Sequence, residues 1–364
     1  MKGEWQLFRI YLTMLTKKSK ILLLGDFSSF HYNLRCELKD KGYNVNVASS
    51  GDGWKKIPCD IRLSYGRKGL LNKVLNQILP LLIIFRLIGY DKVQLIHTKI
   101  LPNYYLNKLF ISLIFLLNKD VYLVACGSDS RYLLQCKRKI LKYSPYDSLE
   151  EHSLIEKKWI DFHNKVVKKV KAIIPVLYEY YLPYQNEPNI TEVIPLLAPK
   201  SKNTFKFNNK IIFFHGLIRE DFKGSKYIRR AFEKLEKEYS DEAEFIIDGH
   251  MPINEYLAII DKTHVIVDQC RSYGYGVNGV IALSKGKILM SGAEPESNDK
   301  LSSSECPVIN IVPNEKDIYE KIKVLIENRD NLEKLSNNSF EYFINVHNPE
   351  LIYKKYISVW KDYV

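Results

Sequence analysis

A chain of 364 residues is longer than one ordinary folding unit, so we expect two domains of roughly 150–200 residues with a cleft between them. Its 46% of apolar and 26% of charged residues exclude the disordered and fibrous classes of protein. The formal net charge of +12 favours anionic partners, whether nucleic acid, acidic lipid or a phosphorylated substrate.

The cysteines and the first residues are typical of a cytoplasmic protein. The six cysteines are scattered, without a C-x-x-C pair or a Cys/His cluster at zinc-ligand spacing, and we interpret them as reduced thiols. Residues 1–19 lack the long apolar run and the cleavage site of a signal peptide, and we interpret them as an amphipathic extension before the first strand. The sequence also has no zinc-finger spacing, no RNA-binding aromatic strand and no helix with a dense basic face, so we expect no nucleic-acid partner.

Strand and helix patterns alternate through the first half of the chain. The apolar run 20–25 ends in Gly-Asp, a helical pattern continues to Leu38, and a second strand pattern covers 42–48. Further strand patterns at 93–97 and 120–125 each follow a long apolar helix. Because continuous apolar strands separated by helices are typical of parallel sheets covered on both faces, we expect an α/β domain here.

The same alternation resumes in the second half. A strand pattern at 210–216 leads to a helix over about 225–239 and to further strand patterns at 243–249, 264–268, 287–290 and 307–312. From Asn314 onward the pattern is helical, with one break at 347–349 and a final helix to Val364.

A polar stretch marked by prolines, from Pro195 to Asn209, separates the two alternating patterns and is the expected linker. We therefore assign residues 1–198 to a first domain, 199–345 to a second domain and 346–364 to a closing helix.

Two apolar segments, 70–88 and 106–117, have the composition of membrane helices but not their length. Charged residues or proline interrupt both of them before the roughly 20 apolar residues that a span needs. One interpretation is that they are helices packed on the first sheet. The other is that they form an apolar and basic surface, with Arg62, Arg67 and Lys68 nearby, that rests on the inner face of a membrane.

The segment 215–224 directly follows the first strand of the second domain. In an α/β sheet this position borders the crevice where ligands bind. Arg219, with a planar fork of donors, and Lys223, with a point charge, would there hold a diphosphate. The alternative is a solvated loop whose charges pair with Glu220 and Asp221.

A glycine-rich turn, 272–279, lies between a later strand and a helix. Glycines let the backbone approach a phosphate, and a helix N-terminus offers free N–H groups and a positive dipole. The turn is weak evidence by itself, but it would open on the same sheet edge as the 215–224 loop.

In these segments the chain resembles the retaining GT-B glycosyltransferases, especially glycosyltransferase family 4. The matching positions are Gly216, Lys223 and Gly224, the Asp248-Gly249 turn, Tyr275-Gly276 with Gly286-Lys287, and in the first domain Gly25, His31, Gly42 and Gly127 to Asp129. The closing segment at Val346 to Pro349 is similar too. The resemblance implies two facing Rossmann-like domains and a last helix that crosses back to the first domain.

The resemblance also implies a role for each matching residue. Gly25, His31 and Asp129 would line the acceptor side, with His31 and Asp129 as catalytic residues. His31 could instead be a loop histidine bonded to backbone, and Asp129 could cap the helix that follows it. The donor would be bound by Gly216, Arg219, Lys223, Gly224, Asp248, Gly249, and the turn Tyr275, Gly276, Val277 and Asn278.

The chain departs from the family pattern in two places. Cys126 stands where the family has histidine or another large residue, and Tyr273 and Ile281 stand where it has two glutamates. We expect Glu294, or less favourably Glu296, to reach the donor in their place, with Asn278 adding a neutral hydrogen bond. The alternative is an exposed acidic turn.

The expected activity is transfer of a sugar from a nucleotide-diphosphate donor to a hydroxyl of a glycan or lipid-linked glycan. The resemblance implies retention of configuration and a role in bacterial capsule or surface polysaccharide synthesis, in the cytoplasm or on the inner face of its membrane. Without an Asp-x-Asp motif, we expect no metal or other cofactor. Two alternatives stay open: a GT-B sugar-nucleotide epimerase using His31, His97, His215 or His250, and a non-catalytic protein that binds a sugar nucleotide or a partner.

Overall fold

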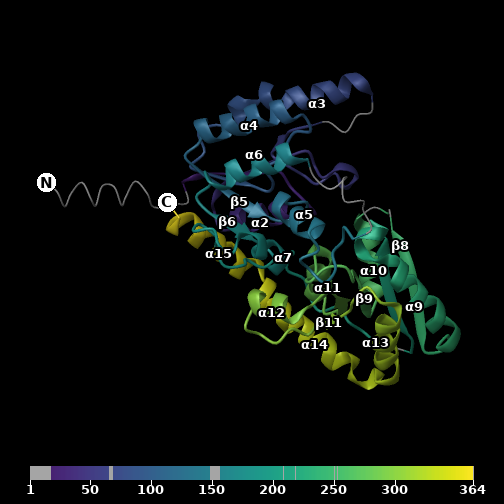
Figure 1. Ribbon diagram of the computed structural model, residues 1–364. Helices are drawn as coiled ribbons and strands as arrows, with labels where there is room; N and C mark the ends of the chain where they lie inside the picture. The colour runs from purple at the N-terminus through teal and green to yellow at the C-terminus, as the bar shows by residue number, and fades with distance from the viewer. Residues whose placement is uncertain are drawn as a thin grey trace.

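The computed structural model describes residues 18–64, 69–147, 156–207, 209–217, 219–249, 251 and 253–363. Within them the chain forms two parallel sheets, one in each half of the sequence, each with helices packed around it (Figure 1). Most of the extension expected before the first strand, as well as Arg67, Lys68 and His250, lies outside the described residues.

The first sheet has six parallel strands in the order β3-β2-β1-β4-β5-β6. The chain adds strands on one side of β1 and then returns to its other side, which is the Rossmann order. The strands are β1 (Lys20–Leu24), β2 (Asn44–Ser49), β3 (Ile61–Arg62), β4 (Lys92–Leu95), β5 (Asp120–Ala125) and β6 (Ile173–Pro175). The sequence pattern does not predict β3 or β6, because two or three residues are too short to show a period.

Helices of the first domain surround this sheet. They are α2 (Phe30–Asp40), α3 (Leu70–Leu82), α4 (Tyr104–Leu117), α5 (Ser130–Lys137), α6 (Lys157–Val167) and α7 (Tyr178–Tyr181). Because the sheet is covered, β1 is buried from Ile21 to Leu24. None of the helices in the described part of the chain has the length and apolar character that a membrane span requires.

The second sheet has five parallel strands in the order β11-β10-β9-β7-β8. They are β7 (Ile211–Leu217), β8 (Ala243–Gly249), β9 (Val265–Val267), β10 (Ile288–Ser291) and β11 (Ile309–Asn310). The strand expected over 307–312 is shorter because β11 pairs with β10 at two residues only, and Pro307 has no N–H to donate.

The helices of the second half include a long C-terminal run. They are α8 (Glu220–Lys223), α9 (Ser225–Glu238), α10 (Ile253–Lys262), α11 (Val277–Ser284), α12 (Pro295–Leu301), α13 (Glu315–Glu327), α14 (Leu332–Tyr342) and α15 (Pro349–Asp362). A π-helical turn, Phe343–His347, separates α14 from α15.

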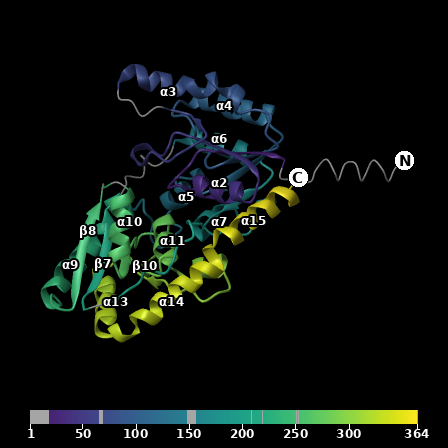
Figure 2. The same ribbon diagram turned by 180° about the vertical axis from the view of Figure 1, so that it is seen from behind.

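Helix α15 crosses from the second domain back to the first, as expected (Figure 2). It packs on α2, and its buried Trp360 donates from Nε1 to Gln94 Oε1 on β4 at 3.2 Å. His347, just before α15, donates from Nδ1 to the carbonyl of Leu196 at 2.6 Å. The helix therefore joins the two domains.

The apolar core is continuous across the domains. One cluster of buried side chains runs from β1 and β4 through Tyr273 and Tyr275 to Trp360 on α15. A second, smaller cluster includes Phe213 of β7, Phe232 of α9 and Ile322 of α13. Because burial of apolar surface drives folding, this continuity favours one relative placement of the two domains.

Candidate functional site

The second sheet has its topological switch point between β7 and β9. The strand β8 lies on one side of β7, and β9, β10 and β11 follow on the other. The loops after β7 and β9 therefore leave the same carboxyl edge in opposite directions, which is where open α/β sheets bind ligands. The 215–224 loop and the 272–279 turn both begin at this edge.

Lys223 is buried at the switch point. Its Nζ lies 2.7 Å from Asp268 Oδ1, directly after β9, and donates to the carbonyl of Gly216 at 3.0 Å. The structure thus pairs Lys223 with Asp268 and not with Glu220 or Asp221. A phosphate placed here would share the charge of Lys223 with Asp268.

Gly224 ends this loop in a left-handed conformation, with φ 78°. A Cβ at this position would lie 2.5 Å from Cys270 Sγ. The residue must therefore be glycine for α9 to begin against the loop that follows β9.

Arg219 is exposed, in contrast to Lys223. Its guanidinium lies 5.5 Å from the centre of the Phe222 ring, and Phe222 packs edge-to-face on Tyr146 of the first domain. Among the described residues Arg219 has no carboxylate within ion-pair distance. It is the cation of this loop whose charge remains available to a ligand at the domain interface.

The Asp248-Gly249 turn lies at the end of β8. Asp248 is exposed, and its Oδ1 accepts from the N–H of Gly249 at 2.6 Å. A Cβ on Gly249 would lie 2.1 Å from the carbonyl oxygen of Leu217. Only glycine lets β8 approach the end of β7 so closely.

The backbone of the glycine-rich turn leads into α11, whereas the side chain of Tyr275 is buried. Gly276 precedes the first turn of α11, where Val277 and Asn278 are half-buried. The Tyr275 side chain is buried on the other side, where its hydroxyl lies 2.8 Å from His347 Nε2. Any ligand at the start of α11 would therefore meet N–H groups of the turn and not the phenol.

Tyr273 and Ile281 occupy the positions of the two glutamates that the family resemblance implies. The Tyr273 hydroxyl accepts from the backbone N–H of Lys142 at 3.0 Å, and its ring stacks on Tyr178. Ile281 is half-buried against the core. Both positions pack apolar or aromatic groups and provide no carboxylate.

Glu294 is buried and hydrogen-bonded to residues of the first domain. The alternative prediction, that it belongs to an exposed acidic turn, is therefore wrong for this residue. Its carboxylate accepts from Tyr143 Oη at 2.5 Å, from Lys142 Nζ at 2.9 Å and from Asn310 Nδ2 at 2.9 Å. Burial raises the pKa of Glu294, but these hydrogen bonds outweigh it and lower the pKa. Glu296 is exposed, 3.5 Å from the same lysine. Donor contact by Glu294 would require exchange of at least one of its hydrogen bonds.

His31 has no free ring nitrogen. It follows Gly25 at the end of β1, is fully buried, and donates from Nδ1 to the carbonyl of Gly25 at 2.6 Å. Its Nε2 accepts from Gln94 Nε2 at 3.1 Å. Burial lowers the pKa of His31 to about 3, so the ring is neutral. The backbone bond is the one that the alternative interpretation expects, although His31 lies in the first turn of α2 and not in a loop.

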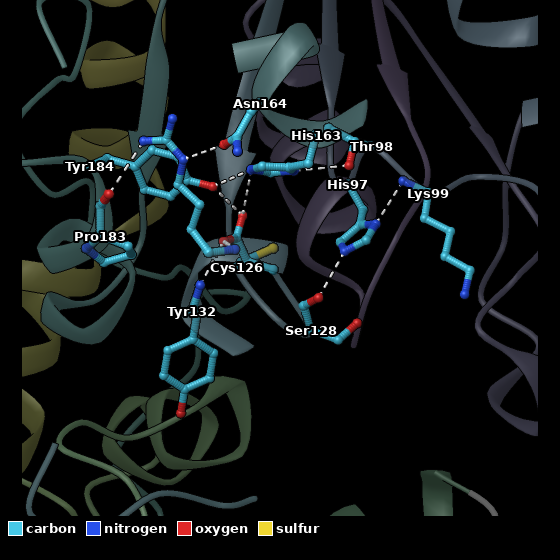
Figure 3. A network of polar contacts seen from close by, with 12 residues as sticks. His97, Thr98, Lys99, Cys126, Ser128, Tyr132, His163, Asn164, Pro183 and Tyr184 are labelled. Atoms are coloured by element: carbon cyan, nitrogen blue, oxygen red, sulfur yellow. Dashed lines mark hydrogen bonds and ion pairs between the residues drawn. The ribbon is translucent and has the colours of Figure 1, made fainter. Parts of the chain in front are cut away.

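Asp129 caps a helix and anchors a buried polar network, of which Figure 3 labels Tyr132, His163 and Tyr184. Its Oδ1 accepts from the N–H groups of Arg131 and Tyr132, at 2.9 and 3.1 Å. Its Oδ2 accepts from Tyr184 Oη at 2.7 Å, and that hydroxyl lies 2.5 Å from His163 Nε2. The structure therefore shows Asp129 as a helix cap, and its catalytic role on the acceptor side stays a prediction.

One residue of this edge, His163, is not predicted from the sequence. His163 belongs to α6, 34 positions beyond Asp129, and burial lowers its pKa to about 4. His97 joins the loops after β4 and β5, since its Nε2 donates to the carbonyl of Ser128 at 3.0 Å (Figure 3). Cys126 is buried at the same edge and donates from Sγ to a backbone carbonyl. A strand followed within a few residues by polar side chains is the signal that marks His97.

Glu179 of α7 is a further interface residue that the sequence does not predict. It is buried, and Ser272 of the second domain donates from Oγ to its Oε1 at 2.6 Å. Burial raises the pKa of Glu179. With Glu294 and Tyr273, this contact shows that the loops after β9 and β10 meet the first domain directly.

The three histidines considered for an epimerase that the structure describes, His31, His97 and His215, are each hydrogen-bonded at both ring nitrogens. His215 is fully buried, with Nδ1 bonded to the carbonyl of Val267 at 2.6 Å and Nε2 to Ser225 Oγ at 2.8 Å. Burial lowers its pKa to about 4. His31 and His97 are likewise bonded at both nitrogens. Among the residues that the structure describes, no three His, Cys, Asp or Glu side chains are grouped as metal ligands.

Comparisons with known proteins identify the architecture. No protein-family model and no curated protein matches the sequence. Among solved structures, sucrose-phosphate synthase from Thermosynechococcus elongatus has a TM-score of 0.63 at 12% identity, over 94% of this chain and 98% of that one. HepE from Anabaena in complex with UDP-glucose has a TM-score of 0.60 at 12% identity, over 93% and 98%.

The chain has the GT-B fold. TarM of S. aureus matches as well, with a TM-score of 0.55 and 13% identity over 78% of this chain, and this chain spans 58% of the length of TarM. At identities this low the likeness shows the GT-B architecture of two Rossmann-like domains, and the roles of individual residues must rest on their own geometry.

Proposed function

We propose that this GT-B protein transfers a sugar from a nucleotide-diphosphate donor to an acceptor hydroxyl. One observation carries the proposal: Arg219, Lys223 and the first turn of α11 lie at the β7/β9 switch point, on the edge that meets the first domain. The HepE structure contains UDP-glucose, which supports a uridine diphosphate sugar as the donor to test first.

Negative charge develops on the departing diphosphate as the bond to the sugar breaks, so cations and N–H groups fixed at that position favour the reaction. Arg219 would supply an available charge, the start of α11 its N–H groups, and Lys223 a charge shared with Asp268. We propose that these groups act without a metal ion or other cofactor. Because His31 is bonded at both nitrogens, we assign it no proton transfer.

For the acceptor we propose a glycan or lipid-linked glycan of a bacterial surface polysaccharide or capsule, used on the cytoplasmic side of the membrane. The net charge of +12 supports an anionic surface or substrate. Retention of configuration is proposed from the family resemblance, and the anomeric coupling constant of the product would test it.

A non-catalytic donor-binding protein is the second candidate. It is favoured by Tyr273 and Ile281 in place of carboxylates and by the engagement of Glu294 with Lys142 and Tyr143. The two candidates differ in turnover, since both would bind a nucleotide sugar but only the transferase would release the nucleotide.

The test measures thermal stabilisation by a panel of nucleotide sugars, and then nucleotide release with and without acceptor glycans. Arg219→Ala should weaken binding of the active donor about 10- to 100-fold, because a charge-assisted contact is lost. Arg230→Ala, which removes an exposed arginine of α9, is the matched control and should bind normally. Activity should persist in EDTA.

Equal donor affinity in both arginine variants would remove Arg219 from the donor site. Loss of activity in EDTA with recovery in Mg²⁺ would refute the metal-free mechanism, and stabilisation without any nucleotide release would favour the binding protein.

A further inference from the structure

Exposed apolar side chains are concentrated on one part of the first domain. Of the fourteen large apolar residues that are exposed in the described chain, ten belong to α3, α4 and the turn between α3 and β4. We call this surface the α3–α4 face; it comprises Val74, Leu75, Ile78, Leu82, Phe85, Ile88, Tyr105, Leu109, Leu116 and Leu117. A concentration of this kind marks an interaction site on a folded protein.

Helical periodicity places these residues on one side of each helix. Along α3 the exposed positions include Leu75, Ile78 and Leu82, at intervals of three and four residues. Along α4 the opposite side buries Phe110 and Ile114 in the core. Figures 1 and 2 both show α3 and α4 side by side at the outer edge of the first domain.

Cations outnumber acids in the sequence segment that contains the face. Residues 61–119 have nine lysines and arginines and one acidic residue, Asp91, which is a formal charge of +8; one of these cations, Lys92, is buried and paired with Asp120. Arg86 and Lys108 are exposed within the face itself. The segment therefore combines apolar side chains with positive charge and almost no negative charge.

We infer that the α3–α4 face binds the surface of a lipid bilayer that carries anionic headgroups. The inference rests on the proposed function, because it states where an enzyme acting on a lipid-linked acceptor would meet the membrane. Side chains such as Phe85 and Leu116 enter the boundary between headgroups and acyl chains, while Arg86 and Lys108 meet lipid phosphates.

Charge favours a bilayer over a second copy of the chain. In a two-fold dimer the same patch faces itself, so the positive charge of one copy would oppose the equal charge of the other. Like charges brought together at an interface are unfavourable. An anionic membrane instead complements both the apolar residues and the cations.

The test is flotation of the full chain with vesicles of phosphatidylcholine alone and with vesicles that also contain phosphatidylglycerol. We expect binding to the anionic vesicles, weakened by salt. Phe85 and Leu116 are 68% and 76% exposed, so Phe85→Ser with Leu116→Ser should leave folding intact and reduce binding about tenfold or more. Arg86→Glu with Lys108→Glu should reduce it about tenfold or more.

The matched controls change equivalent residues elsewhere. Ile140 and Val324 are 54% and 55% exposed outside the face, so Ile140→Ser with Val324→Ser controls for the loss of apolar surface. Arg230→Glu with Lys334→Glu, both exposed on helices of the second domain, controls for the change of charge. Equal binding by the control and test variants would overturn the inference, as would wild-type protein that does not float.

If a second copy of the chain, and not a membrane, covers the α3–α4 face, the experiments give a different result. If sedimentation shows a dimer that Phe85→Ser with Leu116→Ser dissociates, the face is a protein interface and the membrane inference is wrong. Nucleotide-sugar binding, measured without vesicles, separates this test from the proposed function. Donor binding without flotation refutes only the surface, and flotation without donor binding refutes only the proposed donor site.

Discussion

Arg219 and Lys223, the two cations expected to hold one diphosphate, lie in different environments. Arg219 is exposed beside Phe222, whereas Lys223 is buried and paired with Asp268 at 2.7 Å. A buried lysine has two functions, since it can attract a phosphate and it also compensates a buried carboxylate. Substitutions at the two positions should therefore differ in their effect on stability.

Replacing Lys223 should destabilise the protein. Lys223→Ala leaves Asp268 buried without a counter-ion, and the free energy of unfolding should fall by about 3–5 kcal/mol. Urea denaturation would measure it. Lys234→Ala, which breaks an exposed pair with Glu315, is the control and should cost at most about 1 kcal/mol. Equal midpoints for the two variants would show that the Lys223 pair is not buried in solution.

At the scale of elements, α15 is the part of the second domain's chain that completes the first domain. Its Trp360 is fully buried, reaches Gln94 on β4, and lies beside Tyr356. Gln94 in turn bonds His31 in the first turn of α2. The last helix thus supports the carboxyl edge on the proposed acceptor side through two hydrogen bonds.

Replacing Trp360 with a small residue should therefore lower the stability of the first domain. Trp360→Ala should lower the free energy of unfolding by about 3–5 kcal/mol, because the cavity and the lost apolar burial add together. Leu351→Ala on the same helix, where the side chain is partly exposed, should cost much less. Fluorescence-independent detection, such as circular dichroism in urea, avoids the loss of the tryptophan signal. Similar costs for the two variants would mean that α15 is not docked as described.

At the scale of the whole molecule, buried histidines make stability depend on pH. Burial lowers the folded-state pKa from 6.5 to about 3 or about 4 for His31, His163, His215 and His347. The unfolded chain then binds more protons between about pH 4 and 6.5, so this stabilisation is complete above pH 6.5 and is lost as the pH falls. Two buried acids oppose the trend, because burial raises the pKa of Asp26 to about 6 and also raises that of Glu179.

With four histidines against two acids, the free energy of unfolding should decrease by roughly 2–3 kcal/mol per pH unit near pH 5.5. Urea titrations between pH 7.5 and 5 would measure the slope. His347→Gln should flatten it by about 1.4 kcal/mol per pH unit, whatever its effect on stability at neutral pH. A stability that stays constant or increases on acidification would contradict the burial of these histidines.

Local pattern determined the alternation of elements and the edge at which ligands would bind. The apolar runs of β1 and β7, with Gly25 after the first and Gly216 near the end of the second, are visible in the sequence because strand burial and tight turns depend on a few consecutive residues. The same information predicts that the Arg219 loop and the α11 turn share one edge, since parallel strands end on the same side.

Tertiary structure decided what each polar side chain meets. Lys223 finds Asp268, 45 positions away, and Glu294 finds Tyr143, 151 positions away in the other domain. Both ring nitrogens of His31 are hydrogen-bonded, one to the carbonyl of Gly25 and the other to the side chain of Gln94. Such partners come from strand order and domain contact, and burial decides whether a charge is available or already compensated; neither is encoded in the spacing of residues along the chain.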